Sequence, residues 1–151
     1  MRRSTLLFLA LTLAISAIPT GVSAQDTPRW SPPTTQMPVM PTMADLQGDL
    51  TASAGAWLRA AEPVTGAAPA ALRAAGTPKA GSTHTQILRF TRGPVPAMVW
   101  TDRNGDARAD LIEIYRGGTV LIQLIDADYN GQANVMRVYD ASGTLIREER
   151  L

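Results

Sequence analysis

The feature that most constrains this chain is a match between two of its segments at an offset of 24 residues. Without a gap, 102–115 aligns with 126–139: acids and amides fall on acids and amides, and apolar residues on apolar residues. The same offset carries 121–122 onto 145–146, both Leu-Ile. A period of this size is typical of stacked supersecondary units, each of which buries its apolar surface against the next.

Each unit has the pattern of a strand, a tight turn and a second strand. An earlier copy beginning at 87–90 keeps the apolar pattern and lacks the acidic loop. Turn residues then predict three β-hairpins, with the turns inside them near 92–94, 116–118 and 140–143. The hairpins are expected at 86–101, 110–125 and 134–150. Alternation predicts that Ile112, Ile114, Met136 and Val138 face the core, and that Leu111, Glu113 and Tyr115 face the other side.

The segment before the repeats, 44–85, is predicted to hold a helix and a loop. Leu46, Leu50, Trp57 and Leu58 approximate one helical face over 44–61, and Pro63 marks a stop. A short Ala-rich helix is expected within 67–75, followed by a loop over 76–85. The predicted fold class is therefore α+β, mainly antiparallel β-hairpin repeats in a meander of about six strands over 86–151, with one N-terminal helix packed on it.

Two segments precede this domain. A basic start, an apolar run over 6–18 and small residues at 22–24 predict a secretory signal peptide over 1–24, which makes the protein periplasmic or secreted. The apolar run is shorter than the ~20 residues that span a bilayer, and no later run is long enough to span one, so no stable membrane span is expected after signal cleavage. Five prolines over 25–43 predict a flexible tether.

The acidic loops predict calcium, which prefers six to eight oxygen ligands at alternate loop positions. In the first loop, acids and amides occupy positions one, three, five and nine, position seven offers a backbone carbonyl, and a glutamate stands at position twelve. The candidate ligands are Asp102, Asn104, Asp106, Arg108, Asp110 and Glu113. The weaker second loop offers Asp126, Asp128, Asn130 and Asn134.

Two alternatives to metal ligation stay open. The loop acids and amides could simply hydrogen-bond the backbone in Asx-turns between strands. Glu113 could instead form an ion pair with Arg137, which stands one repeat away on the same strand face. Against calcium, Ala107 stands where the sharp turn of such loops normally needs Gly.

The loop Asp102-x-Asn104-Gly105-Asp106-x-x-x-Asp110 resembles the calcium loop of integrin-type FG-GAP and VCBS repeats. Together with the Tyr-Asp-x-x-Gly-x-Leu turn over 139–145, it is similar to tandem acidic-loop hairpin repeats of exported bacterial proteins; the turn alone also resembles YD repeats. The resemblance covers 102–151 and implies calcium loops and β repeats. It implies no reaction, because such repeats occur as scaffolds, adhesive modules and appendages.

Composition disfavours several other classes. The chain has no Cys and a single His, His84, which excludes disulfides and thiolate metal sites and disfavours a catalytic triad. With 14 Lys and Arg against 13 Asp and Glu, nothing points to nucleic acid. The sequence contains no nucleophile-elbow motif and no phosphate-binding motif, so it gives no motif that would indicate an enzyme. Met37, Met40 and Met43 recur at every third position, a spacing that could suit Cu(I).

The sequence thus predicts an exported calcium-binding β-repeat protein, a structural or binding module whose protein or surface-glycan partner is unknown. A small extracytoplasmic copper-handling protein is the first alternative, and an enzyme of unknown type is the second.

Overall fold

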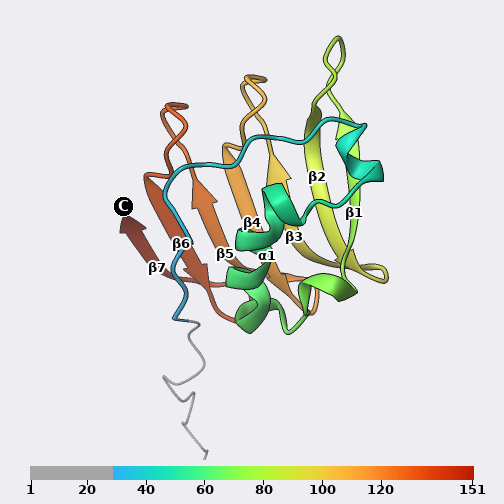
Figure 1. Cartoon of the computed structure of the whole chain (residues 1–151). Helices are drawn as coiled ribbons and strands as arrows, with labels where there is room; N and C mark the ends of the chain where they lie inside the picture. Colours follow the sequence, from blue (N-terminus) through green and yellow to red (C-terminus); the bar gives the residue numbers. More distant parts are fainter. Residues whose placement is uncertain (1–28) are drawn as a thin grey trace, which may run out of the picture.

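Among the residues that the structure describes, seven strands form one antiparallel sheet, and they lie side by side in chain order (Figure 1). The structure is a computed structural model that describes residues 29–151, so the expected signal peptide lies outside the described residues. The strands are β1 Arg73–Pro78, β2 Thr85–Arg92, β3 Val95–Thr101, β4 Leu111–Arg116, β5 Thr119–Ile125, β6 Val135–Tyr139 and β7 Leu145–Arg150. One α-helix, α1 (Thr51–Thr65), lies across one face of this sheet. The expected mainly-β α+β class is confirmed.

The extra strand relative to the six expected is β1. It forms where a short helix and a loop were predicted, and only the 3-10 turn η2 (Pro69–Ala71) is helical there. The strand pairs along its length with β2, from Arg73 opposite Thr91 to Pro78 opposite Thr85. Its Ala- and Gly-rich sequence has little strand preference of its own, so pairing with β2 decides its conformation.

The helix also differs from the prediction at both ends. A 3-10 turn, η1 (Asp45–Gln47), comes first, and Gly48 adopts an extended conformation, so that α1 begins at Thr51 rather than at Ala44. The helix continues through Pro63, which was expected to stop it. Pro63 stands in the last turn, where only one backbone hydrogen bond is lost, and Gly66 ends the helix in the left-handed region at φ 66°.

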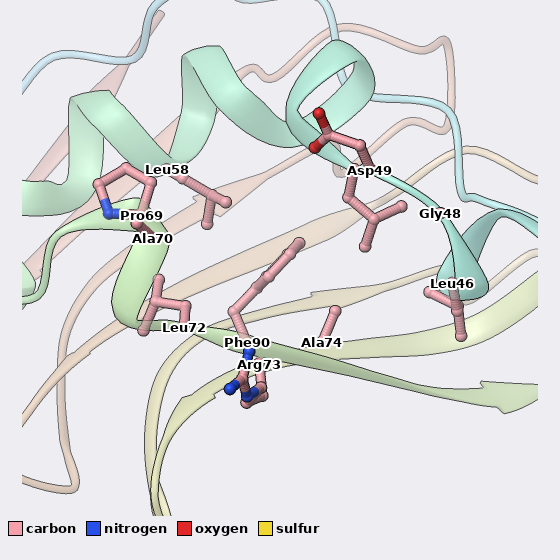
Figure 2. A pocket seen from close by; sticks show the side chains of 11 residues that line it. Leu46, Gly48, Asp49, Leu58, Pro69, Ala70, Leu72, Arg73, Ala74 and Phe90 are labelled. Atoms are coloured by element: carbon pink, nitrogen blue, oxygen red, sulfur yellow. The ribbon is translucent and has the colours of Figure 1, made fainter.

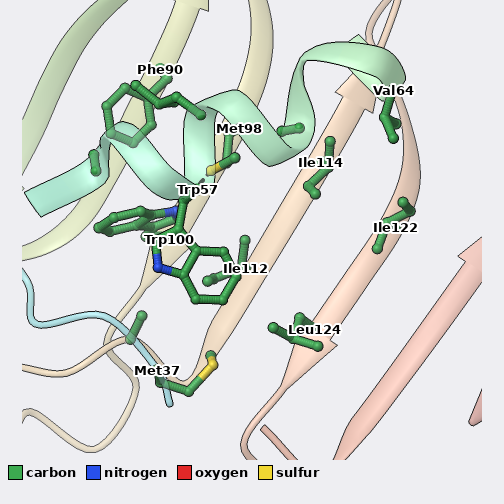
Figure 3. Close-up of a cluster of buried hydrophobic side chains, with 14 of the residues drawn as sticks. Met37, Trp57, Val64, Phe90, Met98, Trp100, Ile112, Ile114, Ile122 and Leu124 are labelled. Atoms are coloured by element: carbon green, nitrogen blue, oxygen red, sulfur yellow. Dashed lines mark hydrogen bonds between the residues drawn. The ribbon is translucent and has the colours of Figure 1, made fainter. Parts of the chain in front are cut away.

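The core lies between α1 and the covered face of the sheet. The strand register builds two apolar rows that run across neighbouring strands: Leu88, Trp100, Ile112, Leu124 and Met136 form one, and Phe90, Met98, Ile114, Ile122 and Val138 form the other. Trp57 of α1 packs edge-on against Trp100, with ring centroids 6.4 Å apart (Figure 3). The alternation predicted for β4 and β6 is confirmed.

The last strand departs from the 24-residue offset. Tyr115 pairs with Val120 across a four-residue connection, whereas Tyr139 pairs with Leu145 across five residues. Ile122 therefore corresponds to Arg147 and not to Ile146, and the gapless match of 121–122 with 145–146 is wrong. A one-residue shift in register moves every side chain to the opposite face of the sheet. Ile146 is therefore exposed. Arg147 and Glu149 stand at the ends of the two core rows instead, where they form an ion pair at 3.0 Å.

The other face of the sheet is covered by no helix among residues 29–151. It carries an aliphatic row near the acidic loops, in which Leu111, Ile125 and Val135 pack together. A second row, one pair further along the strands, consists of Arg89, Val99, Glu113, Gln123, Arg137 and Glu148. We call this second row, together with Tyr115 and Tyr139, the open-face row. Within the described part of the chain, no helix is long and apolar enough to cross a membrane.

Candidate functional site

The acidic loops are bound by the Pro-rich segment. Residues 35–43, which we call the crossing segment, run past the loop ends of the strand pairs (Figure 1). The backbone N–H groups of Met37, Met40 and Met43 donate to carbonyl oxygens at 2.8–3.0 Å, and those acceptors are Gly131, Ala107 and Thr83. In return, the carbonyls of Thr35, Pro38 and Pro41 accept from Ala133, Ala109 and Thr85 at 2.7–2.9 Å. Residues three apart in the crossing segment thus hydrogen-bond to residues that are 24 apart in the rest of the chain.

Strand geometry explains this match. An extended chain advances about 3.3 Å per residue, so three residues cover roughly 10 Å, and two strand spacings also cover roughly 10 Å. The crossing segment therefore presents the same backbone groups to each successive loop. Residues 25–28 of the flexible tether that we predicted over 25–43 lie outside the described residues. The crossing segment, 35–43, differs from that prediction: its prolines stand at positions whose N–H is not needed, and the intervening residues make the hydrogen bonds.

The same step explains the methionine spacing. The side chains of Met37 and Met40 are 0 % exposed and belong to the core cluster, whereas Met43, at the end of the segment, is 39 % exposed. Two of the three thioethers thus fill the core beneath the loops (Figure 3 shows Met37). This arrangement does not favour a shared copper site.

In the first loop, Asp102 binds the backbone. Its side chain is 1 % exposed and accepts from the N–H of Gly105 through Oδ1 and from that of Ala107 through Oδ2. Asp110, also buried, accepts from the N–H groups of Arg103 and Asn104 through one oxygen, Oδ2. These two carboxylates satisfy four donors that the tight loop would otherwise leave unpaired.

The exposed residues of this loop form smaller turns. Asn104 Oδ1 accepts from the N–H of Asp106, and Asp106 Oδ1 accepts from that of Arg108 at 2.9 Å. Burial raises the pKa of Asp110 above its ordinary value; its two backbone hydrogen bonds oppose the rise, and the charges of Asp106 and Asp102 add to it. The three acids repel each other, but each also has a local backbone partner.

The second loop repeats this arrangement with fewer charges. Asp126, 1 % exposed, accepts from the N–H groups of Asn130 and Gly131 at 3.2 and 2.7 Å. Asn134 takes the place of Asp110: its Oδ1 accepts from the N–H of Ala127, and its Nδ2 donates to Asp128 at 3.0 Å. The amide thus accepts one backbone N–H group in this loop, where the carboxylate of Asp110 accepts two in the first.

Two basic side chains lie against the loops, and the sequence patterns did not single them out for this role. Lys79 Nζ donates to the carbonyl of Gly105 at 2.7 Å, and a Cβ on Gly105 would fall on that ammonium group. The Arg108 side chain crosses Gly131 and donates to the carbonyl of Met37 at 2.8 Å. The available sequence signal for these contacts was glycine at 105 and 131, because a residue without a Cβ leaves room for the side chain of Lys79 or Arg108.

Glu113 lies outside the loop. It sits on β4 in the open-face row, where its carboxylate accepts from Tyr115 Oη and from Gln123 Nε2, both at 2.9 Å. Gln123 in turn accepts from Tyr139 Oη at 2.7 Å. Neither reading that we considered describes this geometry, since Arg137 pairs with Glu148 at 2.7 Å. Burial and the hydrogen bond to Glu113 raise the pKa of Tyr115 to about 12, so this phenol stays neutral.

The candidate calcium ligands are therefore only partly brought together. The five first-loop candidates, Asp102 to Asp110, share one turn, and Glu113 points elsewhere. Among residues 29–151, no group of three or more His, Cys, Asp or Glu side chains is placed so that it could hold a metal ion. Both carboxylate oxygens of Asp102 already accept N–H groups, so the geometry fits the Asx-turn alternative better than a coordination shell. Calcium binding stays a prediction.

Comparison with family models, curated proteins and solved structures finds no match to this chain.

Proposed function

We propose that this chain is an exported, non-catalytic β-sheet module that presents its open-face row to a partner outside the cytoplasm. The observation that carries the proposal is the hydrogen-bonded series Tyr115–Glu113–Gln123–Tyr139, which spans three neighbouring strands on the face away from α1. Side chains held in this way lose little further freedom when a partner binds, and their aromatic and planar polar groups suit a protein or a surface glycan.

The opposite face supports the same reading. There α1 covers the sheet, and Trp30 Nε1 donates to the carbonyl of Ala60 at 2.8 Å at the start of the described chain. The crossing segment and the acidic loops hold the sheet at the ends of the strand pairs. The signal-peptide pattern supports export. In this proposal the 24-residue units are tandem hairpin repeats, and their loops are scaffold rather than chemistry.

Co-sedimentation of the purified protein with washed cell envelopes of the producing organism tests the proposal. We expect the native chain to bind, and a Tyr115→Ala/Tyr139→Ala variant to lose most of that binding while it is still folded at the temperature of the assay, as measured by circular dichroism. Tyr129→Asn is the matched control, because Tyr129 is an exposed tyrosine of the second loop. Equal binding by the double variant and the control would contradict the proposal.

Calcium at the first loop is a second, separate proposal. It is favoured by the mutual repulsion of Asp102, Asp106 and Asp110, which a cation would relieve. The second loop, with two carboxylates, has less to gain. A thermal melt with calcium against chelator tests this proposal independently of the open face, and its expected size is given in the Discussion.

A further inference from the structure

A hollow of about 510 Å³ lies at the other end of the sheet from β7, between β1, η1, η2, the connection 48–50 and Leu58 of α1 (Figure 2). Phe90 rises from β2 into it, and its walls are mainly aliphatic: Leu46, Leu50, Leu58, Leu72 and Ala74. Its volume is within the range of about 300–1,000 Å³ that is usual for small-molecule sites. No element of the proposed function uses this hollow.

Two parts of the wall, around Phe90 and around Leu46, are held in place before anything binds. The Phe90 ring packs edge-on against Trp100, with centroids 5.5 Å apart. Leu46 sits over Gly76, where a Cβ would come within 2.5 Å of the leucine Cδ1. The turn that carries Leu46 is fixed by Asp45, whose carboxylate accepts from the N–H and the hydroxyl of Thr42 at 2.7 and 2.8 Å. A ligand would therefore meet a preformed surface.

The hydrophobic core is incomplete at this place. Leu46, Leu50, Leu72 and Ala74 pack against the core cluster but are only partly buried. By contrast, the leucine and isoleucine side chains that face α1 in the middle of the sheet, such as Ile112 and Leu124, are fully buried. An apolar molecule in the hollow would remove the remaining apolar surface from water, which is the main driving force for such binding.

The side chains that line the hollow limit the class of ligand. Of the two charged residues that border the hollow, Arg73 alternates with Ala74 along β1, so its side chain leaves on the opposite face of the sheet (Figure 2). Asp49 is therefore the one acidic side chain among the lining residues, and the other side chains that face the hollow are apolar. We propose that this hollow is a binding site for an uncharged small molecule with an alkyl or aryl body.

Fluorescence titration of the purified protein with N-phenyl-1-naphthylamine, an uncharged apolar probe, tests the site. We expect saturable binding at one equivalent. Ala74→Phe fills the hollow and is expected to weaken binding at least about tenfold, whereas Ala75→Phe, the next residue on the opposite face, leaves it unchanged. Ala70→Trp, at an exposed position of the rim, should act like Ala74→Phe with less risk to folding.

The ligand class has its own test. Anilinonaphthalene sulfonate adds an anionic group to a similar aromatic body, and we expect it to bind about fivefold more weakly than the neutral probe, because the apolar lining does not replace the water around the sulfonate. Equal or tighter binding of the sulfonate would overturn the ligand class. Absence of saturable binding by the native chain, or native affinity in a folded Ala70→Trp variant, would overturn the site itself.

Discussion

The two acidic loops, 102–110 and 126–134, follow the same backbone path with different residues at its two strained positions. In the first loop, Gly105 and Ala107 adopt left-handed conformations, at φ 84° and 67°. In the second, the equivalent residues are Tyr129 and Gly131, at φ 59° and 84°. Each loop thus has glycine at one left-handed position and a side chain at the other, in opposite order. The path is therefore not set by where glycine stands.

What the loops share is a buried aspartate at the first position. Asp102 and Asp126 each accept two backbone N–H groups from the far side of their loop, and each loop then pairs with the crossing segment. The later acids differ, since Asp110 is replaced by Asn134. The comparison indicates that the first aspartate shapes the loop, and that the additional charges of the first loop serve another purpose or none.

The largest expected effect comes from removing the shared residue. Asp102→Ala and Asp126→Ala should each lower the free energy of unfolding by about 3 kcal/mol, because two backbone N–H groups lose the buried carboxylate that accepts from them. Urea denaturation measures the loss. The exposed Asp128→Ala is the control and should cost under about 1 kcal/mol. If Asp102→Ala were as mild as the control, the loop would be held by the crossing segment instead.

The next largest effect is expected from calcium, which should act on the first loop and not on the second. If the extra charges of the first loop bind the ion, tenfold excess of calcium over its dissociation constant adds about 1.4 kcal/mol to the free energy of unfolding. We expect thermal melts to show this gain against chelator, and Asp106→Ala to abolish it while Asp128→Ala does not. An unchanged melting temperature in the native chain would leave the loops as Asx-turns alone.

The strand pairs were predictable from sequence because their signals are local. Alternation placed Ile112 and Ile114 on the core face, and turn residues located the connections. The loop hydrogen bonds were among the alternatives for the same reason, since Asp and Asn form turns with their own neighbours. The extra residue between Tyr139 and Leu145 was overlooked because 121–122 and 145–146 have the same residues, although the register had shifted.

The remaining features depend on contacts that are distant in the chain. β1 has no strand signal of its own and forms only against β2. The crossing segment looks like a tether because its prolines lack donors, yet Met37 and Gly131 are joined across the fold. Its three-residue methionine spacing was visible, but its meaning needs the distance between strand pairs. Lys79 and Glu113 likewise take roles from partners, Gly105 and Gln123, that no short pattern connects.

Ala107 and Gly131 occupy equivalent left-handed positions in the two loops, and exchanging their residue types should change the stability of the fold in opposite directions. Ala107→Gly relieves a left-handed alanine and is expected to stabilise the fold by up to about 1 kcal/mol, after the entropy gained by the unfolded chain is subtracted. Gly131→Ala at the equivalent position should destabilise it by about 1–2 kcal/mol, because the new Cβ also meets the Arg108 side chain. Thermal unfolding of both variants checks the signs. Two losses would show that Ala107 makes contacts worth more than its strain.

The smallest effect is expected from Asp110→Asn, which makes the first loop resemble the second. Because the pKa of Asp110 is raised in the folded state, the native chain holds this proton more readily than the unfolded chain. Its contribution to stability is therefore present at low pH, and it is lost as the pH rises from the ordinary value near 3.8 through the folded value. At pH 7 the native chain must hold Asp110 ionised in a buried position, which lowers its stability, whereas the asparagine variant has no such charge.

We accordingly expect Asp110→Asn to raise the melting temperature at pH 7 by no more than a few degrees without calcium, and the gain to vanish in acid below the ordinary value. Asn134→Asp is the reciprocal variant and should introduce the same pH dependence into the second loop. A gain that is independent of pH would show that the amide packs better than the carboxylate. A loss at pH 7 would show that the two charge-assisted bonds from Arg103 and Asn104 outweigh burial and repulsion, so that charge at this position stabilises the first loop after all.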